Sequence, residues 1–147
     1  MVNTHAIFVK ILLIPLLLSV TACHYTPART VKELSIKISG ISIESEERNT
    51  SEGCKEFQPT VEQVKKHFTY AYPAESYLIT TDRYSPCYAT GSLTYSDNTS
   101  VRWTLYSSGG STITFPSGDH VTMNHRNTPW VDVTACSYGL GDEEDEC

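Results

Sequence analysis

Residues 93–123, LTYSDNTSVRWTLYSSGGSTITFPSGDHVTM, decide the fold of this chain. Apolar residues take alternate positions in four short runs, which are Leu93 and Tyr95, Val101 to Leu105, Ile113 and Phe115, and Val121 and Met123. Turn-forming residues separate these runs at 97–100, 109–110 and 116–119. Alternation is typical of strands with one buried face, and such short turns join neighbouring strands in antiparallel pairs. The stretch therefore predicts an antiparallel β meander.

The alternating pattern continues on the N-terminal side of this stretch. Leu34, Ile36 and Ile38 alternate, and the register then shifts across Ser39–Gly40 before Ile41 and Ile43. Such a shift indicates a β-bulge or a tight bend within one strand. Tyr77–Thr81, rich in β-branched residues, predicts a further short strand.

One segment has the features of an amphipathic helix. Thr60 and Gln63 have the spacing of a capping box, and the apolar stripe that follows is Val61, Val64, Phe68 and Ala71. Tyr72–Pro73 predicts its end, because a residue before proline avoids helical dihedral angles. The predicted fold class is α+β, a mostly antiparallel meander with one helix packed on it.

The N-terminus carries an export signal. Lys10 precedes the apolar run Ile11–Val20, which Pro15 interrupts and which is too short to span a bilayer. Cys23 follows directly after two small residues, and Val20–Cys23 resembles the lipobox of bacterial lipoproteins. The alternative is an ordinary secretory signal with an unpaired thiol.

This resemblance implies cleavage before Cys23 and acylation of its thiol, so that a lipid anchors the protein to a membrane. The expected organisation is a signal peptide over 1–22, a lipidated N-terminus and tether over 23–33, and one α+β domain over 34–147. His24 stands where lipoproteins retained in the inner membrane carry aspartate. The expected location is therefore the outer membrane, facing the periplasm.

Four cysteines remain after Cys23, and an exported domain is expected to pair them as two disulfides. Three pairings are possible, and sequence alone does not choose among them. We favour Cys54–Cys87, which would tie the start of the helix to the loop at Tyr84, and Cys136–Cys147, which would hold the C-terminal tail.

The formal net charge of −6 argues against nucleic acid as a partner, because that binding requires a basic surface. Five acids form one run, Asp142, Glu143, Glu144, Asp145 and Glu146. A run of this kind is commonly a solvated tail, and next to an interface it would steer a basic partner protein.

The sequence predicts no catalytic, metal or cofactor site. His120 and His125 would point to opposite faces of a strand, so they would not converge on a metal. Ser107, Ser108 and Ser111 flank a glycine pair without the Gly-x-Ser-x-Gly pattern of hydrolases. Paired carboxylates for glycoside cleavage cannot be identified, because the candidates sit in turns, namely Asp82, Asp97 and Asp119.

The aromatic residues suggest binding instead of chemistry. Five of the tyrosines cluster in one stretch, and they fit either a sheet core or an interface: Tyr70, Tyr72, Tyr77, Tyr84 and Tyr88. Tyrosine, tryptophan and arginine dominate binding hot spots, so the predicted anchors are Arg83 and Tyr84, followed by Trp130, with Asp142–Glu146 as steering charge.

The chain is expected to be a small, acidic, disulfide-bonded lipoprotein without an active site. In this architecture it resembles the immunity lipoproteins of interbacterial toxin systems. That resemblance implies a non-enzymatic protein that occludes a toxin in the envelope. The second class is a lysozyme inhibitor. Ser108–Gly109 and Ser117–Asp119 of this chain match the inhibitory segment of such proteins only in part, because the lysine of its Lys-Gly-Asp turn is missing. The third is a structural or small-ligand-binding lipoprotein, which would need an apolar pocket.

Overall fold

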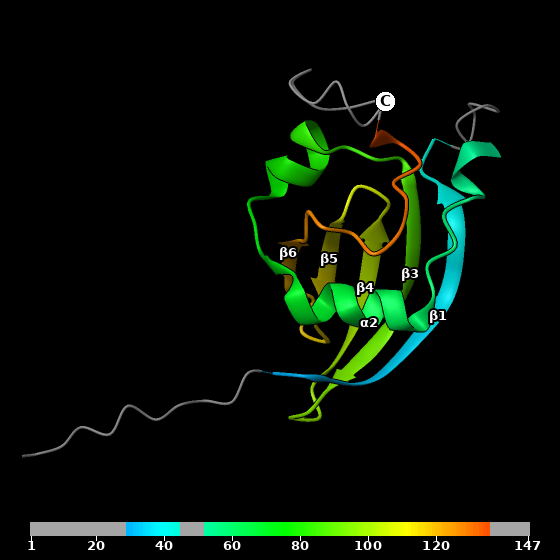
Figure 1. The fold of residues 1–147 in the computed structure, drawn as a ribbon. Helices are drawn as coiled ribbons and strands as arrows, with labels where there is room; N and C mark the ends of the chain where they lie inside the picture. The colour runs from blue at the N-terminus through cyan, green and yellow to red at the C-terminus, as the bar shows by residue number, and fades with distance from the viewer. Residues whose placement is uncertain (1–28, 45–51, 136–147) are drawn as a thin grey trace, which may run out of the picture.

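The computed structural model describes residues 29–44 and 52–135. Their core is one six-stranded antiparallel sheet in the order β1-β3-β4-β5-β6-β2 (Figure 1). The strands are β1 (Val31–Ser42), β2 (Tyr72–Pro73), β3 (Cys87–Tyr95), β4 (Ser100–Tyr106), β5 (Gly110–Thr114) and β6 (His120–Asn124). Among the described residues, no helix is long and apolar enough to cross a membrane.

The predicted meander is confirmed, because β3, β4, β5 and β6 pair in sequence order. β1 joins the other side of β3 and begins at Val31, earlier than the expected pattern at Leu34. Its register shifts between Ile38 and Ile41, and Gly40 there adopts a φ of 69°. A left-handed φ favours glycine, so the predicted bulge is confirmed together with its cause.

The helix α2 (Val61–Tyr70) lies across one face of the sheet (Figure 1). Its predicted capping box is present: the Thr60 hydroxyl accepts from the Gln63 backbone, and the Gln63 side chain accepts from the Thr60 backbone. The buried stripe differs from the prediction. Val61 is exposed and Ala71 lies past the last turn, whereas His67 joins Val64 and Phe68 against the sheet.

The predicted strand over Tyr77–Thr81 is wrong. Leu78–Asp82 form a single helical turn, η1, of the π type. Ile79 fixes this turn by packing on β5, where a Cβ added to Gly110 would lie 2.2 Å from the Cγ2 atom of Ile79. Packing over a glycine thus overrides the strand preference of β-branched residues. The short strand β2 lies instead at Tyr72–Pro73, paired with β6.

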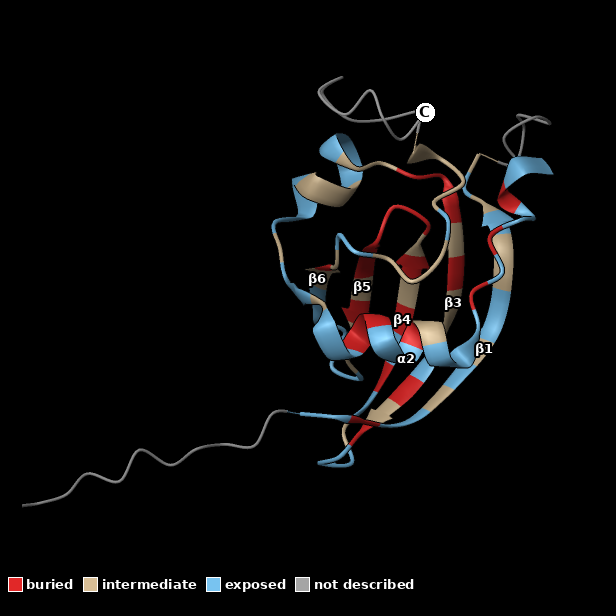
Figure 2. Cartoon of the chain, in the orientation of Figure 1, coloured by how far each residue is buried: buried red, intermediate tan, exposed pale blue. Residues whose placement is uncertain are grey.

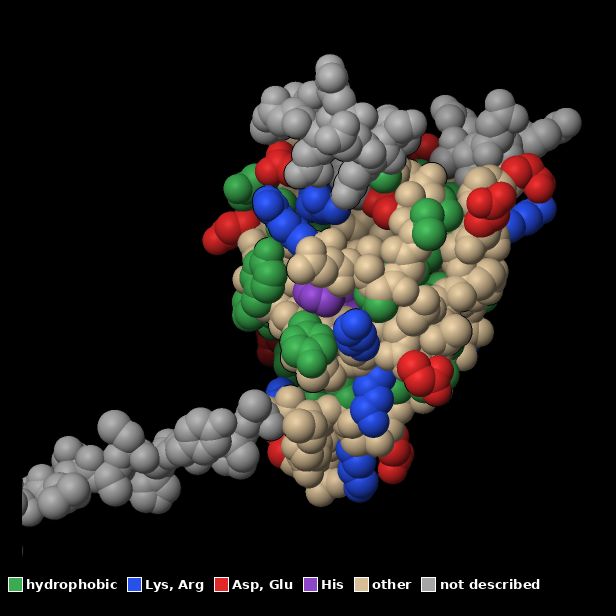
Figure 3. Space-filling model, in the orientation of Figure 1, with side chains coloured by type: hydrophobic (Ala, Val, Ile, Leu, Met, Phe, Trp, Pro, Cys, Tyr) green, Lys and Arg blue, Asp and Glu red, His purple; other side chains and the backbone are tan. Residues whose placement is uncertain are grey.

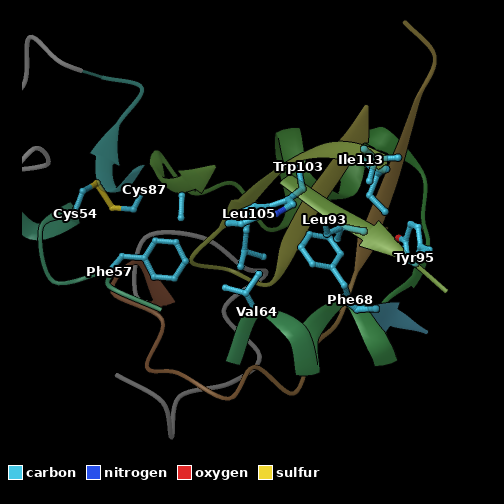
Figure 4. Close-up of a cluster of buried hydrophobic side chains, with 13 residues drawn as sticks. Cys54, Phe57, Val64, Phe68, Cys87, Leu93, Tyr95, Trp103, Leu105 and Ile113 are labelled. Atoms are coloured by element: carbon cyan, nitrogen blue, oxygen red, sulfur yellow. A yellow bond between two sulfur atoms is a disulfide. The ribbon is translucent and has the colours of Figure 1, made fainter. Parts of the chain in front are cut away.

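The core lies between α2 and the facing side of the sheet, where the buried positions of the central strands are concentrated (Figure 2). Figure 4 shows Phe68 reaching toward Trp103, with ring centroids 5.7 Å apart. The predicted disulfide Cys54–Cys87 is present at one end of this cluster. The second predicted pair, Cys136–Cys147, lies outside the described residues.

Candidate functional site

The turn between β4 and β5 is buried, which is unusual for a hairpin tip. Ser107 and Ser108 have no exposed surface. Segments far apart in the sequence hold this turn: Arg83 binds it from the loop before β3, and Trp130 binds it from the chain after β6. Two of the three predicted anchors, Arg83 and Trp130, therefore converge on this turn.

Arg83 and Tyr84 are half-buried and bonded within the domain. The Arg83 Nε atom donates to the carbonyl of Ser108 over 3.2 Å, and the Ser108 hydroxyl donates to the carbonyl of Arg83 over 2.7 Å. The Tyr84 hydroxyl donates to the Glu44 carboxylate over 2.7 Å, and this bond, with burial, raises the pKa of Tyr84 to about 12. Both side chains thus hold the loop before β3 in place.

Trp130 is also half-buried. Its indole Nε1 donates to the carbonyl of Ser107 over 2.8 Å, and its ring lies 5.7 Å from those of Phe57 and His67. The Trp130 side chain thus joins residues 128–133, here called the C-terminal segment, to His67 of α2 and to Phe57 before α2.

An open groove of about 770 Å³ runs beside Trp130. Its walls come from the chain around the start of α2 and from the C-terminal segment, and its lining residues are Glu56, Phe57, Gln58, Pro59, Gln63, Thr128, Pro129, Trp130, Val131 and Val133. Val131 is 84% exposed at the rim. Among the described residues, Glu56 is the one ionisable residue of the lining.

None of the five clustered tyrosines is fully buried in the sheet core. Tyr70, Tyr72 and Tyr77 are exposed by 62%, 48% and 57%. Tyr84 and Tyr88 are half-buried, so neither belongs wholly to the core or to the exposed surface. Figure 3 shows hydrophobic side chains along the side of the molecule where the chain runs from α2 to η1. The Tyr70 ring stacks on His125 with centroids 5.9 Å apart.

Two polar clusters contain residue types that enzymes use in catalysis, namely serine, histidine and aspartate. The Ser107 hydroxyl donates to the Asp132 carboxylate over 2.6 Å. His67 Nε2 lies 2.9 Å from the Ser111 hydroxyl, and burial, with a smaller effect of His125, lowers the pKa of His67 to about 3. Ser107, Ser111 and His67 are all fully buried, so no substrate reaches them in this conformation.

The sequence pattern did not identify His67 as a buried residue. Its position three residues after Val64 places it on the same helix face and could have indicated this. The two histidines considered as metal ligands have different surroundings. His120 is exposed on β6, and His125 is half-buried beside Tyr70. Among the described residues, no three histidine, cysteine, aspartate or glutamate side chains gather in a way that could hold a metal ion.

The acidity of the chain is concentrated outside the described residues. The described part holds nine lysines and arginines against ten aspartates and glutamates, a net charge of −1. The predicted steering residues Asp142–Glu146 and the predicted lipidation site Cys23 both lie outside it. Comparisons with protein-family models, curated proteins and solved structures found no match to the chain.

Proposed function

We propose that the protein is a lipoprotein of the bacterial outer membrane that faces the periplasm and has no enzymatic activity. It binds and neutralises another protein, an antibacterial effector that enters the envelope. In this role it is an immunity protein, with a protein partner, no nucleic acid and no cofactor.

The observation that carries the proposal is the placement of the two ends of the sheet. Val31 pairs with Tyr95, so the N-terminus of the domain lies beside the turn between β3 and β4. Arg29 strengthens this end through an ion pair with Asp97, 2.6 Å long. The buried β4–β5 turn, bonded to Arg83 and Trp130, lies at the other end of the same strands (Figure 1).

A lipid on Cys23 would hold the first end close to the membrane. The residues between Cys23 and Arg29 extend over roughly 20 Å at most, at about 3.5 Å per residue. The end that carries Trp130 and the groove would then face away from the lipid surface. A soluble effector could reach that end without obstruction by the membrane.

The lysozyme-inhibitor alternative is weakened by the burial of the first of its two partly matching segments, while the second, Ser117–Asp119, is exposed but lacks the lysine. Ser108 has no exposed surface and Gly109 is buried beside it, so this turn does not project into another protein. The small-ligand alternative is weakened as well, because the groove beside Trp130 is not an enclosed cavity.

The direct test is protection. The chain is expressed in susceptible bacteria, which are then challenged with a strain that delivers the effector encoded beside its gene. The expected result is survival of the recipients, together with a complex between the purified effector and this protein. Unchanged killing, with no complex at micromolar concentrations, would refute the immunity function.

The anchor has a separate test. Changing Cys23 to Ala removes the acylated thiol, so the protein should move from the membrane fraction to the soluble fraction. Mass spectrometry of the unaltered protein should show the added acyl chains. If the variant stays with the membrane and no acyl mass is found, the lipobox assignment is wrong.

A further inference from the structure

We infer that the groove beside Trp130 receives a lysine or arginine side chain from an apolar loop of a basic partner protein. This inference rests on the proposed function and names the contact through which the effector is bound. The lining of the groove combines apolar side chains with the carboxylate of Glu56. A lysine or arginine side chain can contact the apolar part through its aliphatic stem and the carboxylate through its charged end.

The described lining of the groove exposes somewhat more apolar than polar surface. The apolar residues of the lining include Pro129, Trp130 and Val133, which are partly exposed, and Pro59, which is buried. The Gln63 amide nitrogen donates to the carbonyl of Pro129 over 2.7 Å, and its oxygen accepts from the Thr60 backbone. An occupant therefore gains more by covering apolar surface than by forming new bonds with Gln63.

The charge of the groove selects the sign of the occupant. Glu56 is exposed, and within the described part of the chain it is the one ionisable group of the lining. A lysine or arginine stem can lie along Trp130 and bring its charged head to this carboxylate. The chain's own tail is a poor occupant, because Asp142–Glu146 would place five further carboxylates near Glu56.

The groove is held open before any partner arrives. The disulfide to Cys87 fixes Cys54, three residues before Phe57, and the Trp130 indole is bonded to Ser107. On the same wall as Trp130, the Thr128 hydroxyl donates to the Trp130 carbonyl over 3.0 Å. A preformed site loses little conformational entropy on binding, which suits a tight inhibitor.

The chain contains two tryptophans, and this makes the groove directly observable. Trp103 is 2% exposed in the core, so acrylamide quenching of fluorescence reports mainly on Trp130. The probes are two capped hexapeptides, one alternating leucine with arginine and the other leucine with glutamate. They are added to the full-length protein in detergent, with the five tail acids changed to amides to remove binding by the tail.

The leucine–arginine peptide should protect Trp130, and the leucine–glutamate peptide should not. Glu56→Gln should weaken binding about two- to fivefold, as expected for an exposed ion pair. Val131→Ser should weaken it roughly tenfold through lost apolar contact. The matched controls Glu75→Gln and Val121→Ser change exposed residues away from the groove and should leave the affinity unchanged.

Equal protection by both peptides, or equal effects of the groove variants and their controls, would overturn the inference. Deletion of residues 136–147 that strengthens peptide binding would overturn it too, because the tail would then be the occupant. Survival assays separate the two proposals. If the chain protects bacteria while Glu56→Gln and Val131→Ser protect equally well, the groove assignment fails and the immunity function stands.

Discussion

At the scale of single residues, Gly91 has the least room for a side chain among the described glycines. A Cβ at this position would lie 2.0 Å from the carbonyl oxygen of Ser35 and 2.4 Å from the Trp103 ring. Gly91→Ala should therefore lower the free energy of unfolding by about 1–3 kcal/mol, because the indole cannot move within a filled core. Urea unfolding measures this, and Gly53→Ala is the control, since its Cβ would meet nothing within 4 Å. Equal losses in both variants would contradict the prediction.

His67 makes stability depend on pH. Burial lowers its pKa in the folded protein from 6.5 to about 3, so the unfolded chain binds a proton at this site more readily. The free energy of unfolding should thus be highest above pH 6.5 and fall as the pH drops toward 3, by up to about 1.4 kcal/mol per pH unit.

His67→Gln removes this titration while keeping a side chain able to bond Ser111. Urea unfolding between about pH 6.5 and 5, above the usual range of carboxylates, should show a flatter pH dependence for the variant. His120→Gln, on the exposed face of β6, should keep the slope of the unaltered protein. A slope that survives in His67→Gln would assign the pH dependence to other groups.

At the scale of elements, patterns that are local in sequence were read correctly. The capping box of α2, the order of β3 to β6 and the bulge at Gly40 each depend on a few adjacent residues. Tyr77–Thr81 failed because a five-residue run with β-branched residues fits a strand or a helical turn equally well. The contact between Ile79 and Gly110 decided the outcome, and no local pattern contains it.

The groove could not be predicted from the sequence either, because it too depends on contacts between residues far apart in the chain. Trp130 was recognised as a candidate anchor, but the opposite wall comes from Phe57 and Pro59, more than sixty residues earlier. Only the packing of α2 against the C-terminal segment brings the two walls together. Arg83 and Tyr84 were expected to be available to a partner, whereas the structure bonds both to their own domain.

The disulfide should stabilise the wall of the groove as well as the fold. Cys54 and Cys87 are 33 residues apart, so removing their link should lower the free energy of unfolding by about 3–4 kcal/mol through loop-closure entropy. The paired variant Cys54→Ser with Cys87→Ser should melt at a lower temperature and expose Trp130 more to acrylamide. A melting temperature equal to that of the oxidised protein would contradict this role.

At the scale of the whole molecule, charge and contact surface are separate. The described residues carry a net charge of only −1, whereas the run Asp142–Glu146 adds five negative charges in a few residues. Long-range attraction to a basic partner therefore depends mainly on this run, and contact depends on the domain. Electrostatic steering changes the rate of encounter, while buried contacts set how long a complex lasts.

Changing the five acids of Asp142–Glu146 to amides should therefore slow association with the effector and reduce its dependence on salt, with little change in dissociation. Val131→Ser should show the reverse, with faster dissociation and an unchanged association rate. Surface plasmon resonance at several salt concentrations measures both rates. A variant with five exposed acids of the domain changed to amides, Glu33, Glu52, Glu62, Glu75 and Asp82, controls for net charge alone. If the tail variant dissociates faster while associating normally, the tail is part of the contact and does not act by steering.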